Sequence, residues 1–325
     1  MSVSAATSRT NWLLFLLLGF MWGSSYLFIK IGVDAGLQPM TLIAARLLIG
    51  AALLATVVGV AREPLPRGWR AYAKLSVLGF FGIALPFYLI TWAEATVDSA
   101  LAAVLVSPVP IFVIPFAALL LRDERLTLAK LVGVVVGLVG VALLVGFDPA
   151  SIGRADFTAE LALIGATVSY AFAGVYARKF ITGYRPMIPA LFEVGTALMM
   201  IGVLALAFER PWEAPVTFNS VLAVVWLGLF GSGLAFVIFF RLINQWGATR
   251  TSLVAYLMPV WGIALGAAIL GEPVTWSRIY GTALVIGGIA LVNVRLDQLA
   301  GALAALRDRN APEAEATADV VTEQR

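Results

Sequence analysis

The sequence predicts an all-α integral membrane protein whose ten transmembrane helices form two inverted five-helix repeats. Three observations support this fold class: the composition, the length of the apolar stretches, and a repeated order of segments. The chain of 325 residues is 61% hydrophobic and only 13% charged, with a mean hydropathy of +0.95. A soluble domain carries about twice that charged fraction. We therefore expect the lipid bilayer to surround this chain.

The number of spans follows from their length. A helix needs roughly 20 mostly apolar residues to cross a hydrocarbon core of about 30 Å. Transmembrane strands are about half as long and alternate in polarity, so these continuous apolar runs predict helices. The ten stretches that qualify are 12–33, 39–60, 71–91, 96–121, 128–146, 159–179, 187–208, 218–240, 250–270 and 275–294.

The orientation follows from the basic residues, because cytoplasmic loops are enriched in Lys and Arg. With the N-terminus inside, the N-tail, every second hairpin and the C-tail hold nearly all of the 22 basic residues. The exceptions are Lys30, Arg46, Arg154, Arg210 and Arg278. We therefore expect both termini to be cytoplasmic.

The two halves of the chain repeat one another. LGFFGIALPF at 78–87 matches LGLFGSGLAF at 227–236, and PMTLIAAR at 39–46 matches PMIPALFE at 186–193. Further matches, in the same order, pair Pro108 with Pro259, Glu124 with Glu272, Gly133 with Gly281, and Gly140 with Gly288.

This repeat predicts a first domain at 12–146, a second at 159–294, and a largely disordered cytoplasmic tail at 300–325. Because each half has five spans, the second half enters the membrane from the opposite side. Inverted repeats are a recurring architecture of secondary transporters, with the substrate site between them. Since channels and membrane enzymes can also be duplicated, the repeat favours transport without establishing it.

Several motifs resemble a known family. WGSSYLFIK at 22–30, Arg46 in the second span, and LMPVWGIALGAAILGEPVT at 257–275 are similar to the drug/metabolite transporter superfamily, in particular its EamA-type branch. The resemblance covers residues 12–294 and is greatest to YddG-type amino-acid exporters of bacterial inner membranes. It implies efflux of small metabolites, aromatic and other amino acids among them, by alternating access. The first repeat departs from the pattern, with RDERLT where the second has GEPVT.

Candidate cavity residues come from helix interruptions and from polar or aromatic side chains inside spans. Pro and Gly at matching positions of two halves are a sequence indication of a transporter site. Aromatic and hydroxyl groups would suit zwitterions or neutral amphiphiles. The alternative is simple helix packing, in which glycine and buried tyrosine are common. The candidates are Trp22, Ser25, Tyr26, Gly79, Gly82, Tyr88, Trp92, Ser107, Pro108, Tyr170, Tyr176, Ser232, Phe236, Tyr256 and Pro259.

Three charged residues, Lys30, Arg46 and Glu193, lie inside predicted spans. Charges within a membrane are functional candidates by default. Lys30 lies near a span end, where its side chain could reach the interface. Arg46 and Glu193 lie roughly 10 Å inside opposite interfaces by the helix rise, which argues against a direct ion pair. Arg46 would bind carbonyls, line an outer vestibule, or reach the interface, whereas Glu193 would relay protons.

The composition also weighs against other functions. The chain has no histidine and no cysteine, so it lacks Cys/His metal sites, thiolate nucleophiles and a Ser-His-Asp triad. It has no GxxxxGK[ST] motif for ATP. We expect no catalytic residue, metal, cofactor or nucleic-acid partner, and a monomer that moves a small molecule. The alternatives are a multidrug or organic-cation exporter, then a passive channel or a nucleotide-sugar transporter.

Overall fold

The computed structural model describes residues 2–93, 105–121, 127–145, 157–270 and 275–293, and all regular secondary structure in these ranges is helical. The start of the span expected at 96–121, the paired Glu124 and Glu272, and the tail at 300–325 lie outside the described residues.

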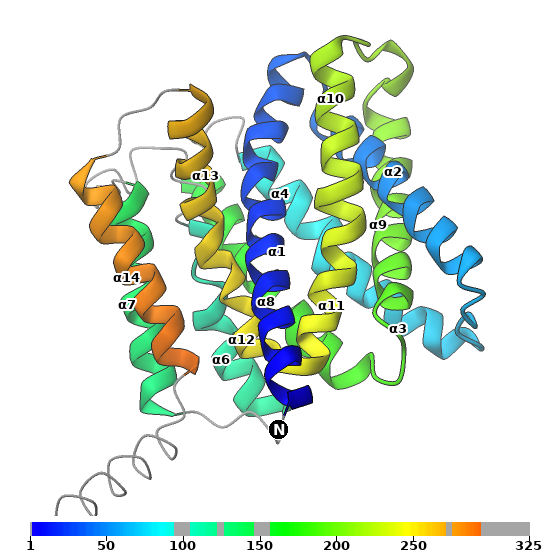
Figure 1. Cartoon of the computed structure of the whole chain (residues 1–325). Helices are drawn as coiled ribbons and strands as arrows, with labels where there is room; N and C mark the ends of the chain where they lie inside the picture. Colours follow the sequence, from blue (N-terminus) through cyan, green and yellow to red (C-terminus); the bar gives the residue numbers. More distant parts are fainter. Residues whose placement is uncertain (1, 94–104, 122–126, 146–156, 271–274, 294–325) are drawn as a thin grey trace, which may run out of the picture.

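The helices of the first half run from the N-terminus to residue 145 (Figure 1). They are α1 (Ser2–Asp34), α2 (Pro39–Val60), α3 (Trp69–Gly79), the π-helical η1 (Phe80–Ala84), α4 (Leu85–Ala93), α6 (Val109–Leu120) and α7 (Leu128–Val145).

The second half follows a similar order. Its helices are α8 (Phe157–Phe180), α9 (Met187–Phe208), the short 3₁₀ turn η3 (Pro211–Glu213), α10 (Phe218–Trp226), the π-helical η4 (Leu227–Leu234), α11 (Ala235–Trp246), α12 (Ala248–Ser252), α13 (Val254–Leu270) and α14 (Trp276–Asn293).

Six described stretches are long and apolar enough to cross a membrane, fewer than the ten expected from the sequence. They are 9–34, 39–60, 69–93, 157–180, 187–208 and 218–246. The helices at the other four positions, α6, α7, α13 and α14, are shorter, at 12, 18, 17 and 18 residues. Turns before α6 and α13 account for part of this difference.

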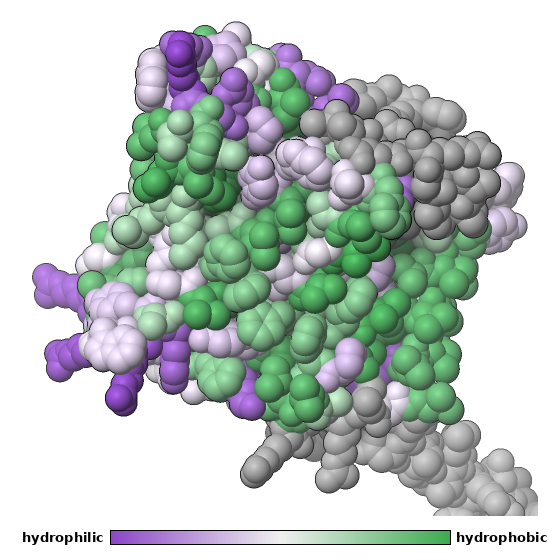
Figure 2. Space-filling view, turned by 180° about the vertical axis from the view of Figure 1, so that it is seen from behind, coloured by the Kyte–Doolittle hydropathy of each residue, from purple (hydrophilic) through white to green (hydrophobic). Residues whose placement is uncertain are grey.

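The molecular surface is apolar where lipid would lie. Figure 2 shows hydrophobic side chains across the middle of the visible face, with hydrophilic residues at its upper end and lower left corner. Large apolar side chains such as Leu48 on α2 and Met199 on α9 are 60% and 72% exposed. Such a surface matches a hydrocarbon core bounded by two polar interfaces.

Helices of the two halves pack against each other through glycines on α7 and α14, which lie side by side in Figure 1. A Cβ atom on Gly133 would lie 2.8 Å from the carbonyl oxygen of Gly288, and one on Gly140 would lie 2.8 Å from that of Gly281. Small residues permit this close backbone approach between membrane helices. Residue numbers rise along α7 as they fall along α14, so the two helices run antiparallel.

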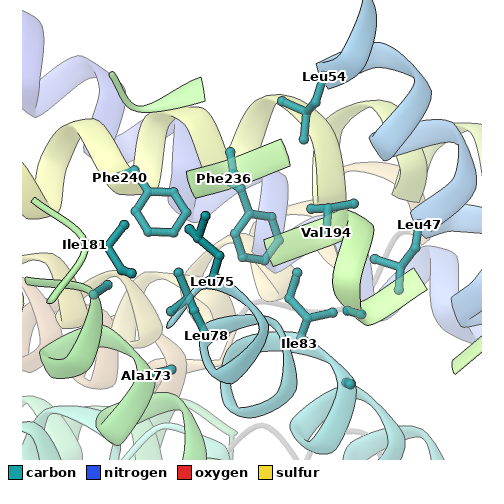
Figure 3. Close-up of a cluster of buried hydrophobic side chains, with 14 of the residues drawn as sticks. Leu47, Leu54, Leu75, Leu78, Ile83, Ala173, Ile181, Val194, Phe236 and Phe240 are labelled. Atoms are coloured by element: carbon teal, nitrogen blue, oxygen red, sulfur yellow. The ribbon is translucent and has the colours of Figure 1, made fainter. Parts of the chain in front are cut away.

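A second packing region joins helices from both halves around the middle of the bundle (Figure 3). Leu47 of α2, Leu78 of α3, Val194 of α9 and Phe236 of α11 belong to this buried cluster. Because lipid tails are as apolar as these side chains, van der Waals packing stabilises the cluster more than water exclusion does.

Acidic residues join α2 to α9 at both ends. Glu209, directly after α9, accepts hydrogen bonds from the backbone N–H groups of Met40 (3.0 Å) and Thr41 (2.7 Å) at the start of α2. At the other end, Glu63 follows α2 and forms an ion pair with Arg185, which precedes α9. A carboxylate at a helix N-terminus satisfies backbone donors that the helix itself leaves unpaired.

Candidate functional site

A cavity of about 130 Å³ lies between the two halves of the chain. Its walls come from α1, α2, η1, α4 and α6 of the first half, and from α8, α9, α11, α12 and α13 of the second. Most bordering side chains are apolar or aromatic, and hydroxyl groups come from Ser25, Tyr26, Thr91, Tyr170 and Ser252. Ligand sites typically combine such a largely apolar lining with a few placed polar groups.

Four of the walls contribute three or more residues at helical spacing, because positions three or four residues apart share one face of a helix. These residues are Trp22, Ser25, Tyr26 and Ile29 on α1; Phe87, Ile90 and Thr91 on α4; Tyr170, Ala173 and Gly174 on α8; and Phe236, Phe239 and Ile243 on α11.

Arg46 of α2 borders the cavity and is only 4% exposed. Its Nε donates a hydrogen bond to Ser232 Oγ at 3.0 Å. Its guanidinium carbon lies 4.7 Å from the centroid of the Phe87 ring, in a cation–π contact. These contacts hold the guanidinium inside the bundle, so the alternative in which Arg46 reaches the membrane interface is wrong.

Glu193 of α9 borders the same cavity and is 1% exposed. Its Oε2 is buried and has no hydrogen-bond partner among the described residues. Buried carboxylate oxygens are normally paired, because an unpartnered polar atom is costly to remove from water. A buried polar atom without a partner beside a cavity therefore indicates a place where a ligand group could bind.

The two charges occupy equivalent places in the two halves. The guanidinium of Arg46 lies over Gly231 of η4, where a Cβ atom would be 2.8 Å from Nη2. The carboxyl of Glu193 lies over Gly82 of η1, where a Cβ atom would collide with Oε1. Gly82 and Gly231 are themselves matched in the sequence repeat. Each charged side chain thus fits against the π-helical segment of the opposite half.

The π-helical turns also free carbonyl groups for side-chain donors. Trp22 Nε1 donates to the Gly231 carbonyl of η4 at 3.2 Å, and Ser169 Oγ donates to the Phe81 carbonyl of η1 at 2.6 Å. Single π-turns inside α-helices are frequent at functional sites. The glycine-rich interruptions expected in both halves are therefore present, as π-helix.

The helix interruptions expected at Pro108 in the first half and at Pro259 in the second do not occupy equivalent places in the structure. Ser107 and Pro108 form a turn before α6, whereas Pro259 lies inside α13. In the second half the turn falls at Leu253, between α12 and α13. A proline inside a membrane helix is tolerated where neighbouring groups satisfy the freed carbonyl.

The structure brings eight of the predicted residues to the cavity. They are Trp22, Ser25, Tyr26, Arg46, Gly82, Tyr170, Glu193 and Phe236. Arg46 and Glu193, expected near opposite interfaces, border one common space. No ion pair joins them in the structure, as their positions along the chain predicted.

Other predicted residues do not border the cavity because they serve packing. Tyr256 donates a hydrogen bond from its hydroxyl to the Val134 carbonyl on α7 at 2.8 Å. Tyr176 packs between the rings of Phe172 and Phe180 along α8, tilted against both. Ser232 lies behind the lining and holds Arg46 in place.

The remaining predicted residues also lie outside the cavity lining. Gly79 faces α9, where a Cβ atom would lie 2.9 Å from the carbonyl oxygen of Glu193. Tyr88 packs against the cluster of Figure 3, and Trp92 is 42% exposed. Lys30 is exposed and pairs with Asp34 one turn later (3.3 Å). Ser107, Pro108 and Pro259 are also absent from the lining, although their neighbours Val106, Val109 and Met258 belong to it.

Sequence reasoning missed Phe87, Phe239 and Ser252, which also border the cavity. Helical spacing could have identified Phe239, since it lies three residues after the predicted Phe236. The sequence repeat could have identified Phe87, since it is the last residue of the segment at 78–87 and matches the predicted Phe236. Ser252 has no repeat match of this kind.

Comparison with known proteins identifies the family. The model of the EamA-like transporter family matches residues 10–146 and 157–294. The chain belongs to the EamA-like transporter family. The EamA-type resemblance drawn from the motifs is therefore confirmed, and the protein is a multi-pass membrane protein of a transporter family with two EamA repeats.

Relatives of this EamA-like transporter cover most of its length. The uncharacterized transporter YoaV of Bacillus subtilis (strain 168) is 27% identical over 275 residues, which cover 83% of this chain and 91% of YoaV. The uncharacterized inner membrane transporter YedA of Escherichia coli (strain K12) is 30% identical over 278 residues, covering 85% and 87%.

One solved crystal structure superposes on this EamA-like transporter with a TM-score of 0.74 at 23% sequence identity. The superposition covers 88% of this chain and 96% of that one. At this level of identity, the likeness supports the fold alone.

Proposed function

We propose that this protein is an inner-membrane secondary transporter that exports amino acids, aromatic and others, or similar small metabolites by alternating access. In this proposal ten transmembrane helices form two inverted five-helix repeats, both termini are cytoplasmic, and a monomer is sufficient. The observation that carries the proposal is a cavity bordered by helices of both repeats and by one buried charge from each.

The size and chemistry of the cavity support a small substrate. A cavity of about 150 Å³ holds a benzene molecule, so a cavity of about 130 Å³ is far too small for a nucleotide sugar, and an aromatic amino acid fits only when the two repeats move apart. The lining offers aromatic faces, hydroxyl groups, and one charge of each sign. A sugar phosphate would instead favour a cluster of Arg and Lys.

The repeat architecture supports alternating access. Transporters built from inverted repeats bind near the bilayer midplane and move one repeat or bundle against the other. Here α2 packs against α9, and polar contacts join this pair at both ends through Glu209 and through Glu63. Breaking the contacts at one end while keeping those at the other would open the molecule to one side at a time.

The organic-cation exporter remains the second candidate because of one observation. Glu193 presents a carboxylate oxygen that has no partner in the described part of the chain, and aromatic residues such as Trp22 and Tyr170 line the same cavity. Carboxylates and aromatic faces together recognise organic cations. The buried Arg46 beside the same cavity favours a substrate that also carries a negative group.

Flux into proteoliposomes containing the purified full-length protein tests the proposal. Labelled phenylalanine, leucine, alanine and an organic cation such as tetraphenylphosphonium would be compared with protein-free liposomes, under imposed proton and sodium gradients. Saturable, protein-dependent amino-acid flux is expected. Flux of the cation alone would replace the proposal with the second candidate, and no flux of any amino acid would refute it.

A further inference from the structure

The two formally charged residues that border the cavity have opposite signs and come from different repeats. Arg46 lies on α2 and Glu193 on α9, and no ion pair joins them. Two opposite charges that border one low-dielectric space would normally attract strongly. The packing of each side chain against a π-helical glycine of the other repeat holds it in its own place.

We propose that Arg46 and Glu193 form a two-ended recognition site for a zwitterion. The guanidinium of Arg46 binds the substrate carboxylate, and the carboxylate of Glu193 binds its ammonium group. This inference rests on the proposed function and assigns the specificity of that same cavity to two residues.

The surroundings of Arg46 suit a carboxylate. A guanidinium carries five N–H donors in a planar fork, and Nε uses one of them on Ser232. Ser232 and the Phe87 ring fix the orientation of the plane. A fixed guanidinium plane binds carboxylates through two parallel hydrogen bonds, which a lysine at this position could not provide.

The surroundings of Glu193 suit an ammonium group. An ionised carboxylate only accepts hydrogen bonds, and Glu193 Oε2 has no donor among the described residues. An ammonium group brings three donors and a compensating charge.

The opposite signs of the two charges provide selectivity. A carboxylic acid without an amine would pair with Arg46 but leave Glu193 unpaired in a dry site. An amine without a carboxylate would leave the guanidinium of Arg46 without an anionic partner. Buried charges without partners are strongly destabilising, so both kinds of ligand are disfavoured relative to the zwitterion. The aromatic and aliphatic walls contact the substrate side chain and do not require it to carry a charge.

Ligand analogues test this assignment in the wild-type protein. Phenylalanine, 3-phenylpropionate (no amine) and phenylethylamine (no carboxylate) share one side chain. Their affinities for the purified full-length protein in detergent follow from the ligand dependence of its melting temperature. Phenylalanine is expected to bind at least about tenfold more tightly than either analogue, since each removes a charged hydrogen-bonding partner.

Two variants make the test specific. Glu193→Gln is expected to weaken phenylalanine at least about tenfold while 3-phenylpropionate keeps or gains affinity, because the amine contact is lost and no unpaired carboxylate remains. Arg46→Gln is expected to weaken phenylalanine similarly while phenylethylamine keeps or gains affinity, since no unpaired guanidinium remains. Matched controls are Glu213→Gln and Lys30→Gln, which neutralise exposed charges outside the cavity. Retained affinity for one analogue also shows that the variant is folded.

The outcomes separate this inference from the proposed function. If wild-type protein binds phenylalanine but Glu193→Gln keeps the full preference for phenylalanine over 3-phenylpropionate, the inference is wrong and the proposed function stands. If both variants unfold, equal wild-type affinity for phenylalanine and its analogues overturns the inference. If the wild-type protein binds phenylethylamine and no amino acid, both the inference and the proposed function fail.

Discussion

Arg46 and Glu193 face one cavity from equivalent positions of the two repeats, each lying over a glycine of the other repeat's π-helical segment. The backbone around each residue is also equivalent: the carbonyl of Arg46 lies against Gly228, and that of Glu193 against Gly79. The repeats have therefore kept the position while reversing the sign of the charge. A symmetric scaffold thereby holds an electrically asymmetric cavity.

The glycines beneath the two charges are expected to be intolerant of a methyl group. Gly82→Ala and Gly231→Ala would push a Cβ atom into Glu193 and Arg46. Overpacking costs about 1–3 kcal/mol, so both variants should lower the melting temperature and reduce amino-acid flux. The control is Gly195→Ala on α9, where nothing lies within 4 Å of the added atom. Equal behaviour of Gly82→Ala and Gly195→Ala would contradict the placement of Glu193.

The contact between α7 and α14 gives a prediction about stability alone. A Cβ atom on Gly288 would lie 2.6 Å from the carbonyl oxygen of Gly133, a backbone atom that cannot rotate away. Gly288→Ala should therefore lower the melting temperature clearly, whereas Gly287→Ala should not, because its Cβ atom meets nothing within 4 Å. Adding Gly133→Ala to Gly288→Ala should cost less than the sum of the single changes, since the helices have already separated. Strict additivity would argue against a shared contact.

The N-terminus of α2 depends on Glu209. Glu209→Ala removes the acceptor for Met40 N, Thr41 N and Thr41 Oγ1. Losing a helix cap costs about 0.5–2 kcal/mol, and we expect a lower melting temperature in detergent. Glu213→Ala is the matched control, because Glu213 pairs only with Arg210 at the exposed surface (3.2 Å) and such pairs contribute about 0–1 kcal/mol. A larger effect of Glu213→Ala would show that the loop, not the cap, matters.

Water access to the cavity can be measured with single cysteines, since the chain has none of its own. Thr91→Cys and Ser252→Cys border the cavity and should react with a small charged thiol reagent in proteoliposomes, more slowly when phenylalanine is present. Met199→Cys, on an exposed face of α9, should stay unlabelled because lipid disfavours the reactive thiolate. Labelling of Met199→Cys with none at Thr91→Cys would refute the assignment of the cavity as the transport route.

The sequence was most informative where polar boundaries enclose an apolar run. The spans predicted at 39–60 and 187–208 coincide with α2 (Pro39–Val60) and α9 (Met187–Phe208). Each begins at a Pro-Met turn and ends where polar residues return. The span predicted at 250–270 contains a turn at Leu253, where the polar residues 250–252 give way to an apolar run, so this change in polarity could have moved the predicted start of the long helix to Val254.

The site was harder to predict than the spans. Counting residues from the end of each helix placed the backbone of Arg46 and of Glu193 near opposite interfaces. This count takes no account of the length of the two side chains or of how the helices pack. The meeting of both residues at one cavity depends on the contacts of α2 with η4 and of α9 with η1, which a single sequence does not contain.

The glycine contacts between α7 and α14 have a consequence for how the two repeats can evolve. Gly133 touches Gly288 and Gly140 touches Gly281, so each contact takes one glycine from each repeat. A side chain gained at any of these four positions would separate both helices, whichever repeat it arose in. The duplicated halves, which have diverged as far as opposite charges at Arg46 and Glu193, are expected to have remained mutually dependent along this line.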